Sequence, residues 1–344
     1  MRRRSGNRAA FLRPVRRACV LCAVLASCGT CAVLAPRKFG GYSQRMKGVI
    51  VAAGYGTRFL PATKTVPKEL LPLIDRPAID FVVEEFLAAG IREILIISSR
   101  RKHALEDYFD REVELESVFR AEGAQAKLEA IRPPDAEVQF VRQRKMMGTG
   151  HALLLAESFV GDSPFVVAYP DDLQHGGTPP AKLLVDAYKE TGCSVLATMS
   201  DPPNLERYGV LSLAADGIHV DGIVEKPAPG SEPSREASLG RYLYTPELFP
   251  LLHEGWDLHL ASAGASAEVR ALPPAACAVE GLPEYFHTYA LNKLMKAGKV
   301  VFARIDGERL DTGSPAGYLR AILRYAAGRP DLAEVLREEL QRLR

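Results

Sequence analysis

The sequence predicts an α/β protein in which a doubly wound, mixed sheet is covered by helices on both faces. Three observations lead to this fold class. First, a short apolar strand, Val49 to Ala52, runs into a glycine-rich loop. Second, apolar helices and strands alternate from Pro77 onward. Third, acidic residues follow two later strands. Such alternation needs crossover connections, which place helices on both faces of a largely parallel sheet. The 344 residues, 47% hydrophobic, suffice for one large α/β domain or two small ones.

The charge of the chain limits the class of partner. The formal net charge is only +2, which argues against a nucleic-acid-binding protein. The first 45 residues contain Arg and Lys but no acid, so the remainder is mildly acidic. The body of the protein is therefore not expected to bind polyanions.

The N-terminal segment, residues 1–45, permits two interpretations. Arg2–Arg17 is basic, Ala18–Ala26 is apolar but short for a bilayer span, and Leu25–Cys28 is similar to a lipoprotein cleavage site. Taken alone, the segment indicates a signal peptide. The first core strand, however, begins directly after Met46. We therefore favour an upstream-extended gene start or a disordered tail over export, and we expect no membrane association.

The cysteines give no strong indication of a metal site. Four of them form two C-x-x-C pairs in the N-terminal segment, but only five residues separate the pairs and the run is hydrophobic, so a zinc site is the weaker interpretation. These four are Cys19, Cys22, Cys28 and Cys31. Cys193 and Cys277 are expected to be isolated, reduced thiols in the core.

The loop within Met46–Pro72 is shaped to hold a phosphate chain. Gly54 and Gly56 permit positive φ and close backbone approach, so that amide N–H groups can point at an anion. Prolines restrict the loop and fix where its cations stand. The prolines are Pro61, Pro67 and Pro72, and the cations are Arg58, Lys64 and Lys68.

Two common glycine-rich loops are excluded. A dinucleotide fingerprint requires Gly or Ala where Phe59 stands, and its helix starts at once, whereas Pro61 intervenes here. A P-loop requires Gly-Lys-Ser/Thr after four spacer residues, which is absent. An ordinary basic surface loop is the remaining alternative, but it does not explain why glycines, prolines and cations coincide over so long a span.

The stretch resembles the signature G-x-G-T-R-(x)4-T-K-x-x-P-K-x-L-x-P of sugar nucleotidyltransferases. It matches the bacterial UTP–glucose-1-phosphate uridylyltransferases most closely, in Leu60–Lys64 and Pro67–Glu69. The resemblance covers Met46 to Gly328 and implies a Rossmann-like, GT-A-like fold in a cytoplasmic protein that starts near Met46. By this resemblance, the nucleotide is bound by Ala53, Gly54, Gly56 and Thr57, and Arg58 and Lys68 are catalytic.

The next stretch alternates between helix and strand. Ala78–Ala89 has helical apolar spacing and ends at Gly90. Glu93–Ser98 is an apolar strand, and Lys102–Asp110 is helical again. Residues 111–135 are polar and less patterned, which indicates a helical excursion.

A polar loop follows the predicted strand Val138–Arg142. Gln143 offers an acceptor and donors, which an edge of uracil needs, whereas an ordinary strand-to-helix loop is the alternative. A helix is predicted from Ala152. His151 is expected to pack or to cap, because the chemistry needs no base there. By the resemblance, Gln143 and Gly148 hold the base of the nucleotide.

Two acids follow the buried strand Phe165–Ala168, at the carboxyl end where ligands bind in this architecture. A hard cation that bridges phosphates takes one or two carboxylates and leaves other positions to water and substrate. The resemblance places a metal ligand at Asp171, whereas the role of Asp172 is open. A helix N-cap is the alternative for either acid.

The sugar side is expected to follow a helix at Pro180–Thr191, a strand at Ser194–Met199 and a hairpin-like pair around Asp221–Gly222. Adjacent Glu and Lys side chains point to opposite faces of an extended strand, so a bend at Pro227 is needed for both to meet substrate. By the resemblance, the sugar 1-phosphate is bound by Gly209, Glu225, Lys226 and Gly240, and Lys226 is also catalytic. The resemblance further implies that Gly240–Tyr242 lines the sugar pocket.

Residues 253–282 break the pattern. They are rich in Ala, Ser and Pro without clear periodicity, which predicts an insertion or a loose loop. Further on, Thr288 and Ala290 match an acidic run of the family, but Tyr289 replaces its Asp. The sugar specificity and subunit contacts that the family implies are weakened at this point.

A second acid precedes the last predicted elements. Val300–Ile305 is a strand, and Asp311 stands before a helix that ends near Tyr325. The resemblance makes Asp311 the second metal ligand. An N-cap is the alternative, although Ser314 is the better cap because a proline follows it. A C-terminal helix is expected in 329–344.

The resemblance implies one nucleotidyltransferase domain, residues 46–328, that transfers a uridylyl group from UTP to glucose 1-phosphate with Mg²⁺ as cofactor. A homo-oligomer is also implied, and neither nucleic acid nor a membrane is an expected partner. One alternative is a nucleotidyltransferase that uses dTTP or GTP and another sugar phosphate. Another is a catalytically silent regulator that binds nucleotide sugars, but the presence of both acids and all the cations argues against it.

Overall fold

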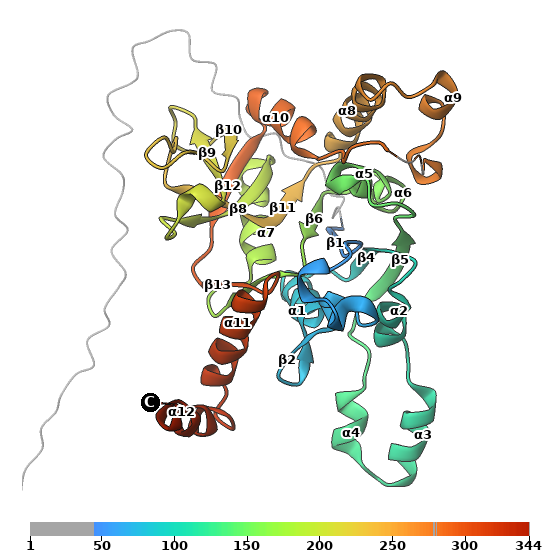
Figure 1. Cartoon of the computed structure of the whole chain (residues 1–344), viewed down its shortest axis with the longest axis vertical. Coiled ribbons are helices and arrows are strands. Elements are labelled where there is room, and N and C mark those ends of the chain that lie inside the picture. The colour runs from blue at the N-terminus through green and yellow to red at the C-terminus, as the bar shows by residue number, and fades with distance from the viewer. Residues whose placement is uncertain (1–44, 278, 280, 344) are drawn as a thin grey trace, which may run out of the picture. The chain divides into compact units, whose positions relative to one another are not determined.

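A mixed sheet organises the computed structural model, which describes residues 45–277, 279 and 281–343 (Figure 1). These residues belong to one structural unit, 44–344. The segment interpreted above as a signal peptide or tail, with its four cysteines, lies outside the described residues. Among the described residues, no helix has the length and apolar character needed to cross a bilayer.

Nine strands of the described chain form the central sheet. In the middle of the sheet, β1 (Lys47–Val51) pairs in parallel with β4 (Glu93–Ser98) on one side and with β6 (Phe165–Ala168) on the other. On the far side of β4, β5 (Glu137–Arg142) continues the sheet in the same direction. The strands predicted at 93–98 and 165–168 are confirmed.

Antiparallel strands extend the sheet beyond β6. β11 (Glu236–Tyr244) pairs antiparallel with β6 and with β8 (Ser194–Ser200). β12 (Val300–Arg304) runs parallel to β8, and the hairpin of β9 (Gly209–Leu213) and β10 (Val220–Glu225) completes the sheet. The mixed α/β sheet predicted from the sequence is therefore confirmed.

The central strands are apolar along their length because both faces of the sheet are covered. Val49 is fully buried in one core cluster, and its neighbour Ile50 is fully buried in the other. Successive side chains of a strand point to opposite faces, so one short strand supplies both cores. Burying a side chain of this size contributes about 1.5–3 kcal/mol.

Helices pack on both faces of the sheet, as the crossover connections require. One face is covered by α1 (Ala78–Ala88), α2 (His103–Phe109) and α7 (Pro180–Thr191), and the other by α5 (Gly148–Leu154), α8 (Leu248–Ser262) and α10 (Thr288–Lys296). The short α6 (Glu157–Val160) follows α5. Cys193 is partly exposed and Cys277 is buried, and both thiols are free.

One helical hairpin lies outside this layered core, and a second pair of helices ends the chain. In Figure 1, α3 (Val113–Ala121) and α4 (Gln125–Ala130) stand away from the sheet, which confirms the helical excursion predicted for 111–135. Near the C-terminus, α11 (Pro315–Gly328) runs slightly beyond its predicted end, and α12 (Ala333–Arg342) follows.

The loose loop predicted for 253–282 is wrong over its first part. α8 continues to Ser262, and the short α9 (Ala267–Arg270) follows it. Gly255 lies inside α8 and obscured the helical period, although the next residue, Trp256, is only 2% exposed and packs into the core. Burial of this helix face, and not local propensity, holds the segment in a helix.

Two local boundaries also differ from prediction. The turn expected at Asp221–Gly222 is wrong, because this pair lies inside β10 at a register shift of its ladder with β9. The hairpin turns instead at Asp216, whose carboxylate accepts two backbone N–H groups that follow it at 2.9 Å. An Asp side chain can close a turn in this way without an Asp-Gly pair. α5 begins at Gly148, earlier than the predicted Ala152.

Two short ladders lie beside the central sheet. β2 (Pro72–Leu73) pairs with β3 (Arg76–Pro77) in the segment between the glycine-rich loop and α1. β7 (Asp172–His175) pairs antiparallel with β13 (Glu308–Asp311). The second ladder joins the chain that leaves β6 to the chain that enters α11, and thus brings the two predicted acidic segments together.

Candidate active site

The loop after β1 is held by short 3-10 turns. These turns are Thr57–Phe59, Ala62–Lys64 and Lys68–Leu70. Gly56 precedes the first turn at φ 68°, a conformation that favours glycine, and its carbonyl accepts a hydrogen bond from Thr63 Oγ1 at 2.7 Å. Gly54 is exposed, and no atom lies within 4 Å of the position of an added Cβ. The backbone at Gly54 is therefore open to a ligand.

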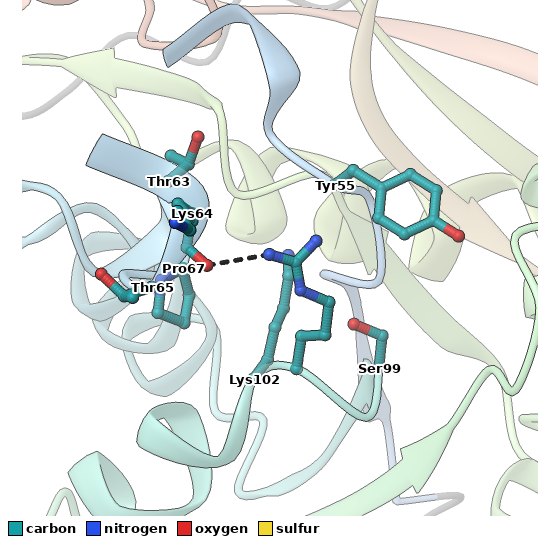
Figure 2. A pocket seen from close by; sticks show the side chains of 8 residues that line it. Tyr55, Thr63, Lys64, Thr65, Pro67, Ser99 and Lys102 are labelled. Carbon is teal, nitrogen blue, oxygen red and sulfur yellow. Dashed lines mark hydrogen bonds between the residues drawn. The ribbon is translucent and has the colours of Figure 1, made fainter. Parts of the chain in front are cut away.

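Figure 2 shows how this loop is anchored on the turn before α2. Arg101 Nη2 donates to Lys64 O at 2.8 Å. The cavity between Tyr55, Thr65 and Ser99 measures about 20 Å³, which is room for no more than a water molecule. The Arg101–Lys64 hydrogen bond therefore fixes the loop.

A buried ion pair lies beneath the loop. The Lys102 ammonium donates to both Glu69 carboxylate oxygens, at 2.7 and 2.8 Å, and also to Ala52 O. The Glu69 side chain is 0% exposed and that of Lys102 is 6% exposed. Burial raises the pKa of Glu69 and lowers the pKa of Lys102. Ala52 precedes the loop and Glu69 lies near its far end, so Lys102 ties both ends together.

The loop opens onto a cavity of about 300 Å³, a size suited to part of a small ligand. Six of the predicted site residues line it: Ala53, Gly54, Lys68, Gln143, Gly148 and Asp171. Residues absent from the prediction also line it, among them Met146, Thr149, Tyr169 and Glu284. The remaining predicted loop residues, Gly56, Thr57 and Arg58, are not part of this lining.

The connection between β5 and α5 forms one wall of the cavity. Gln143 Nε2 lies 3.1 Å from Gly148 O and 3.0 Å from His151 Nδ1. Gly148 has φ 89°, and an added Cβ would lie 2.3 Å from Tyr285 O, so only glycine allows this packing. His151 is buried and packs in the interior, as predicted.

Asp171 and Asp311, the two predicted metal ligands, converge although they are far apart in sequence. The β7–β13 ladder sets Asp311 opposite Asp172, and the Thr312 N–H donates to Asp171 O at 2.8 Å. A Cβ added at Gly313 would come within 3.0 Å of Asp171 Oδ2 and 3.1 Å of Asp311 Oδ1. The two carboxylates therefore face the same point, beside a residue without a side chain.

Two cations stand at these acids. Lys68 Nζ lies 2.5 Å from Asp171 Oδ2. Arg58 Nη1 lies close to the point that the two carboxylates face, 3.3 Å from the position of a Cβ added at Gly313. Burial alone would raise the pKa of Asp171, but attraction to Lys68 and Arg58 outweighs this effect and lowers it. Among the described residues, no three or more His, Cys, Asp or Glu gather as metal ligands. A pair of carboxylates suits Mg²⁺, which takes its remaining ligands from water and phosphates.

The alternative that these acids cap helices is wrong. A strand, β7, follows Asp171 and begins with Asp172. Ser314 caps α11 through its side chain, as predicted. Asp311 Oδ1 instead accepts the Gly313 N–H at 2.9 Å, which turns the chain around the carboxylate.

Asp172, whose role the sequence left open, joins three segments. Its Oδ1 accepts from Arg309 Nε at 2.7 Å, and its Oδ2 accepts from the Gly240 N–H at 2.9 Å. The Arg309 guanidinium lies 5.3 Å from the centre of the Tyr208 ring. Asp172 therefore links the segment that contains the predicted metal ligands to the predicted sugar side at β11 and β9.

The structure places Gly209, Glu225 and Lys226 together at the edge of the sheet. Gly209 pairs with Glu225 in the β9–β10 ladder, and a Cβ added to it would lie 3.1 Å from Glu225 Oε1. Lys226 has φ 47°, so the chain bends directly before Pro227. The side chains of Glu225 and Lys226 are exposed and are not part of the 300 Å³ cavity. Arg309 connects them to the acids, because it contacts the Tyr208 ring on one side and Asp172 on the other.

Sequence reasoning missed the buried groups that hold the site in place. Besides Glu69 and Lys102, these include Glu85 in α1, which forms a bidentate ion pair with Arg241 at 3.0–3.1 Å. The expectation that Arg241 lines the sugar pocket is wrong, because its side chain is buried against Glu85. Arg241 also donates to Tyr169 O at 2.9 Å and so braces the chain ahead of Asp171. The sequence indicates one of these groups, Glu85, because it is a charged residue within a helix of otherwise apolar spacing.

Tyr289, which stands where the family carries Asp, lies half-buried on α10. Its hydroxyl donates to Glu254 Oε1 at 2.8 Å, and Lys293 Nζ lies 3.2 Å from the same oxygen. These contacts join α10 to α8. Tyr289 is not part of the cavity lining.

Comparison with known proteins identifies the family of the chain. A family model described as nucleotidyl transferase matches residues 47–272, which is more than half of the chain. The chain belongs to the nucleotidyl transferase family. The matched residues include the glycine-rich loop, Gln143 and Asp171, and exclude Asp311.

Relatives within the family share most of their length with this chain. It is 36% identical over 304 residues to UTP–glucose-1-phosphate uridylyltransferase 2 of Staphylococcus saprophyticus, covering 87% of this chain and 98% of that protein. It is 36% identical over 296 residues to the UTP–glucose-1-phosphate uridylyltransferase of Bacillus subtilis, covering 84% and 94%. These matches confirm the resemblance found in the sequence.

Solved structures of this family are similar to the fold. UTP-bound UGPase from Acinetobacter baumannii has a TM-score of 0.72 at 30% identity, covering 87% of this chain and 99% of that one. A UDP-glucose pyrophosphorylase complexed with UDP-glucose has a TM-score of 0.65 at 33% identity, covering 83% and 99%. The predicted fold class is confirmed by both.

Proposed function

We propose that the protein transfers a uridylyl group from UTP to glucose 1-phosphate and releases pyrophosphate. The observation that carries the proposal is one cavity lined by an open glycine loop, an amide and a carboxylate, at Gly54, Gln143 and Asp171. These groups suit a phosphate chain, a base edge and a cation, respectively. The similarity to uridylyltransferases, and to structures with UTP and UDP-glucose, supports the same substrates.

The reaction requires positioning and charge neutralisation but no general base. A phosphate oxygen of glucose 1-phosphate attacks the α-phosphorus of UTP in line, and the bond from that phosphorus to the β-phosphate oxygen breaks as pyrophosphate leaves. The attacking oxygen is already anionic, so no proton has to be removed. Arg58 and Lys68 stabilise the triphosphate and the departing pyrophosphate, and Lys226 orients the attacking phosphate.

Mg²⁺ is part of the proposal, with Asp171 and Asp311 as the residues that would hold it. Their carboxylates face one point beside Gly313, and a low pKa keeps Asp171 ionised. When bound, the ion supplies charge neutralisation between the two reacting phosphates. One cation, the Lys68 ammonium, already contacts the Asp171 carboxylate.

The proposal is tested by the nucleotide and sugar dependence of pyrophosphate release. UTP, dTTP, GTP and ATP are each supplied with glucose 1-phosphate and Mg²⁺, and UTP is expected to give the highest kcat/KM. Higher turnover with another nucleotide would favour a different nucleotidyltransferase. Absence of turnover with all four, despite measurable UDP-glucose binding, would favour a silent regulator.

The proposal also includes a cytoplasmic location and a homo-oligomeric state. UTP and glucose 1-phosphate are intracellular metabolites, and the family resemblance implies subunit contacts. Size-exclusion chromatography with light scattering measures the oligomeric state directly. A monomer at all concentrations would remove that part of the proposal and leave the reaction untouched.

Lys226→Ala is expected to raise KM for glucose 1-phosphate, whereas Arg58→Ala is expected to lower kcat and raise KM for UTP. Arg58 stands beside the two acids, and Lys226 lies on the β9–β10 edge, so the two cations serve opposite ends of the site. A lost charge-assisted contact costs about 1.5–3 kcal/mol, roughly a 10- to 150-fold effect. Initial rates at varied concentrations of each substrate separate the two effects.

Some crossover between the substrates is expected, because both bind beside the same acids. Lys189→Ala removes a lysine on the exposed side of α7 and serves as the control for a lost surface charge. If Lys226→Ala weakens only UTP binding, the assignment of Glu225 and Lys226 to the sugar phosphate is wrong.

A further inference from the structure

The Gln143 side chain is held in one orientation by the protein around it. It is only 3% exposed and lies at the end of β5, in the wall of the cavity. Its amide nitrogen lies 3.1 Å from Gly148 O. A backbone carbonyl can only accept hydrogen bonds, so the atom facing it must be the NH₂ group and not the amide oxygen.

The second neighbour of this NH₂ group is His151, whose tautomer is fixed by its own contacts. His151 Nε2 lies 3.0 Å from Pro274 O, another atom that can only accept. Nε2 therefore carries the proton, and Nδ1 of the neutral ring is an acceptor. Burial lowers the pKa of His151, which keeps the ring neutral. The Gln143 NH₂ group thus donates to His151 Nδ1 at 3.0 Å.

Both N–H bonds of the Gln143 amide are consequently used inside the protein. The amide oxygen Oε1 has no hydrogen bond among the described residues, yet it is not one of the buried side-chain atoms that lack a partner. It therefore retains accessible surface, and Gln143 borders the cavity. The group that Gln143 offers to a ligand is an acceptor, not a donor.

We propose that His151 is a positioning residue for base selection: by accepting from the Gln143 NH₂ group, it turns Oε1 toward the cavity, which selects a pyrimidine with an N3–H. Uracil carries that N–H and can donate to Oε1. Cytosine has a bare acceptor at N3, so two lone pairs would face each other. This inference rests on the proposed function, because it needs a nucleotide with its base at Gln143.

A purely structural role for His151 makes a different prediction. The ring also packs 5.3 Å from Trp256 and bonds to Pro274, so it braces the segment after α8 against α5. If that were its whole contribution, replacing His151 would lower stability and affect all nucleotides equally. Base selection would be unchanged. The two roles use different ring nitrogens, and this makes them separable.

The test uses two substitutions that each retain one nitrogen position. His151→Asn places an amide oxygen close to the position of Nδ1 and can still accept from Gln143. His151→Gln reaches the position of Nε2 and can donate to Pro274 O, but it leaves Gln143 without its acceptor. The measurement is the ratio of kcat/KM for UTP to kcat/KM for CTP, with glucose 1-phosphate as the second substrate and the thermal midpoint recorded for each variant.

We expect the UTP-to-CTP ratio to stay within about 3-fold of the wild type in His151→Asn and to fall at least about 10-fold in His151→Gln. His287→Gln is the matched control, because His287 is a buried histidine that contacts Thr149 Oγ1 and not Gln143. It is expected to lower stability and leave the ratio unchanged. An unchanged ratio in His151→Gln overturns the proposal.

A second variant covers the case in which His151→Gln does not fold. Gln143→Leu removes the amide and leaves the His151 contact with Pro274 intact, and the ratio is expected to collapse to a similar extent. A high ratio in Gln143→Leu overturns the proposal as well. If the wild-type protein turns over UTP and CTP equally, base selection is refuted and the proposed function stands. If it turns over neither nucleotide, the proposed function is refuted.

Discussion

Replacing Asp171 or Asp311 by Asn is expected to lower kcat about 100-fold or more, because each change removes one negative charge from the proposed Mg²⁺ site without changing side-chain volume. Charge stabilisation by a catalytic metal is worth several kcal/mol, so an effect of this size follows when the ion is held by one carboxylate instead of two. The measurement is pyrophosphate release at saturating UTP and glucose 1-phosphate, with circular dichroism to show that each variant is folded.

Asp306→Asn is the matched control for these two variants. Asp306 lies on the connection from β12 to β13, accepts hydrogen bonds from Thr178 at 2.7 and 2.8 Å, and does not line the cavity. Its kcat is expected to stay within about 3-fold of the wild type, as is usual for a surface substitution. A kcat near wild type in Asp171→Asn or Asp311→Asn would remove that residue from the metal site.

The sequence contained enough local information to predict the loop and the acids. Gly54, Lys68 and Asp171 each lie in a short motif next to a buried strand, and their chemistry can be interpreted without knowledge of the partner. The strands themselves were predictable because burial on both faces requires continuous apolar runs. The structure brings these motifs to one cavity, as the topology of a doubly wound sheet implies.

The buried partners of these motifs could not be predicted in the same way. Lys102 meets Glu69 and Arg241 meets Glu85 across long sequence separations, and neither pairing leaves a local pattern. Likewise, α8 forms in a segment whose composition favours a loop, because packing of Trp256 overrides propensity. The features that could not be predicted depend on tertiary contacts.

The Glu69–Lys102 pair is expected to be indispensable for placing the loop, although it is a weak source of stability. Burial raises the pKa of Glu69 and lowers that of Lys102, so the interior opposes both charges. Buried pairs of this kind often break even against apolar residues of similar volume. Lys102 holds Ala52 O and Glu69, and the residue beside Glu69 is Lys68, which contacts Asp171.

Glu69→Gln and Lys102→Met are each expected to lose about 3–5 kcal/mol of unfolding free energy, because one charge is left buried without a partner. Both variants should also raise KM for UTP, since the loop loses the tie between its ends. Urea unfolding measures the first effect, and initial rates measure the second.

The double variant Glu69→Leu/Lys102→Met separates stability from positioning. With no charge left unpaired, it should regain most of the lost unfolding free energy, whereas its kcat/KM for UTP should stay at least about 10-fold below wild type because Ala52 and Lys68 are no longer tied together. Glu236→Gln is the control: Glu236 is a buried acid that bonds to Thr198, Ser200 and Arg304, away from the cavity, so it should lose stability without a change in KM for UTP. A double variant with full kcat/KM for UTP would show that the pair only fills space, since an apolar replacement would then serve the loop equally well.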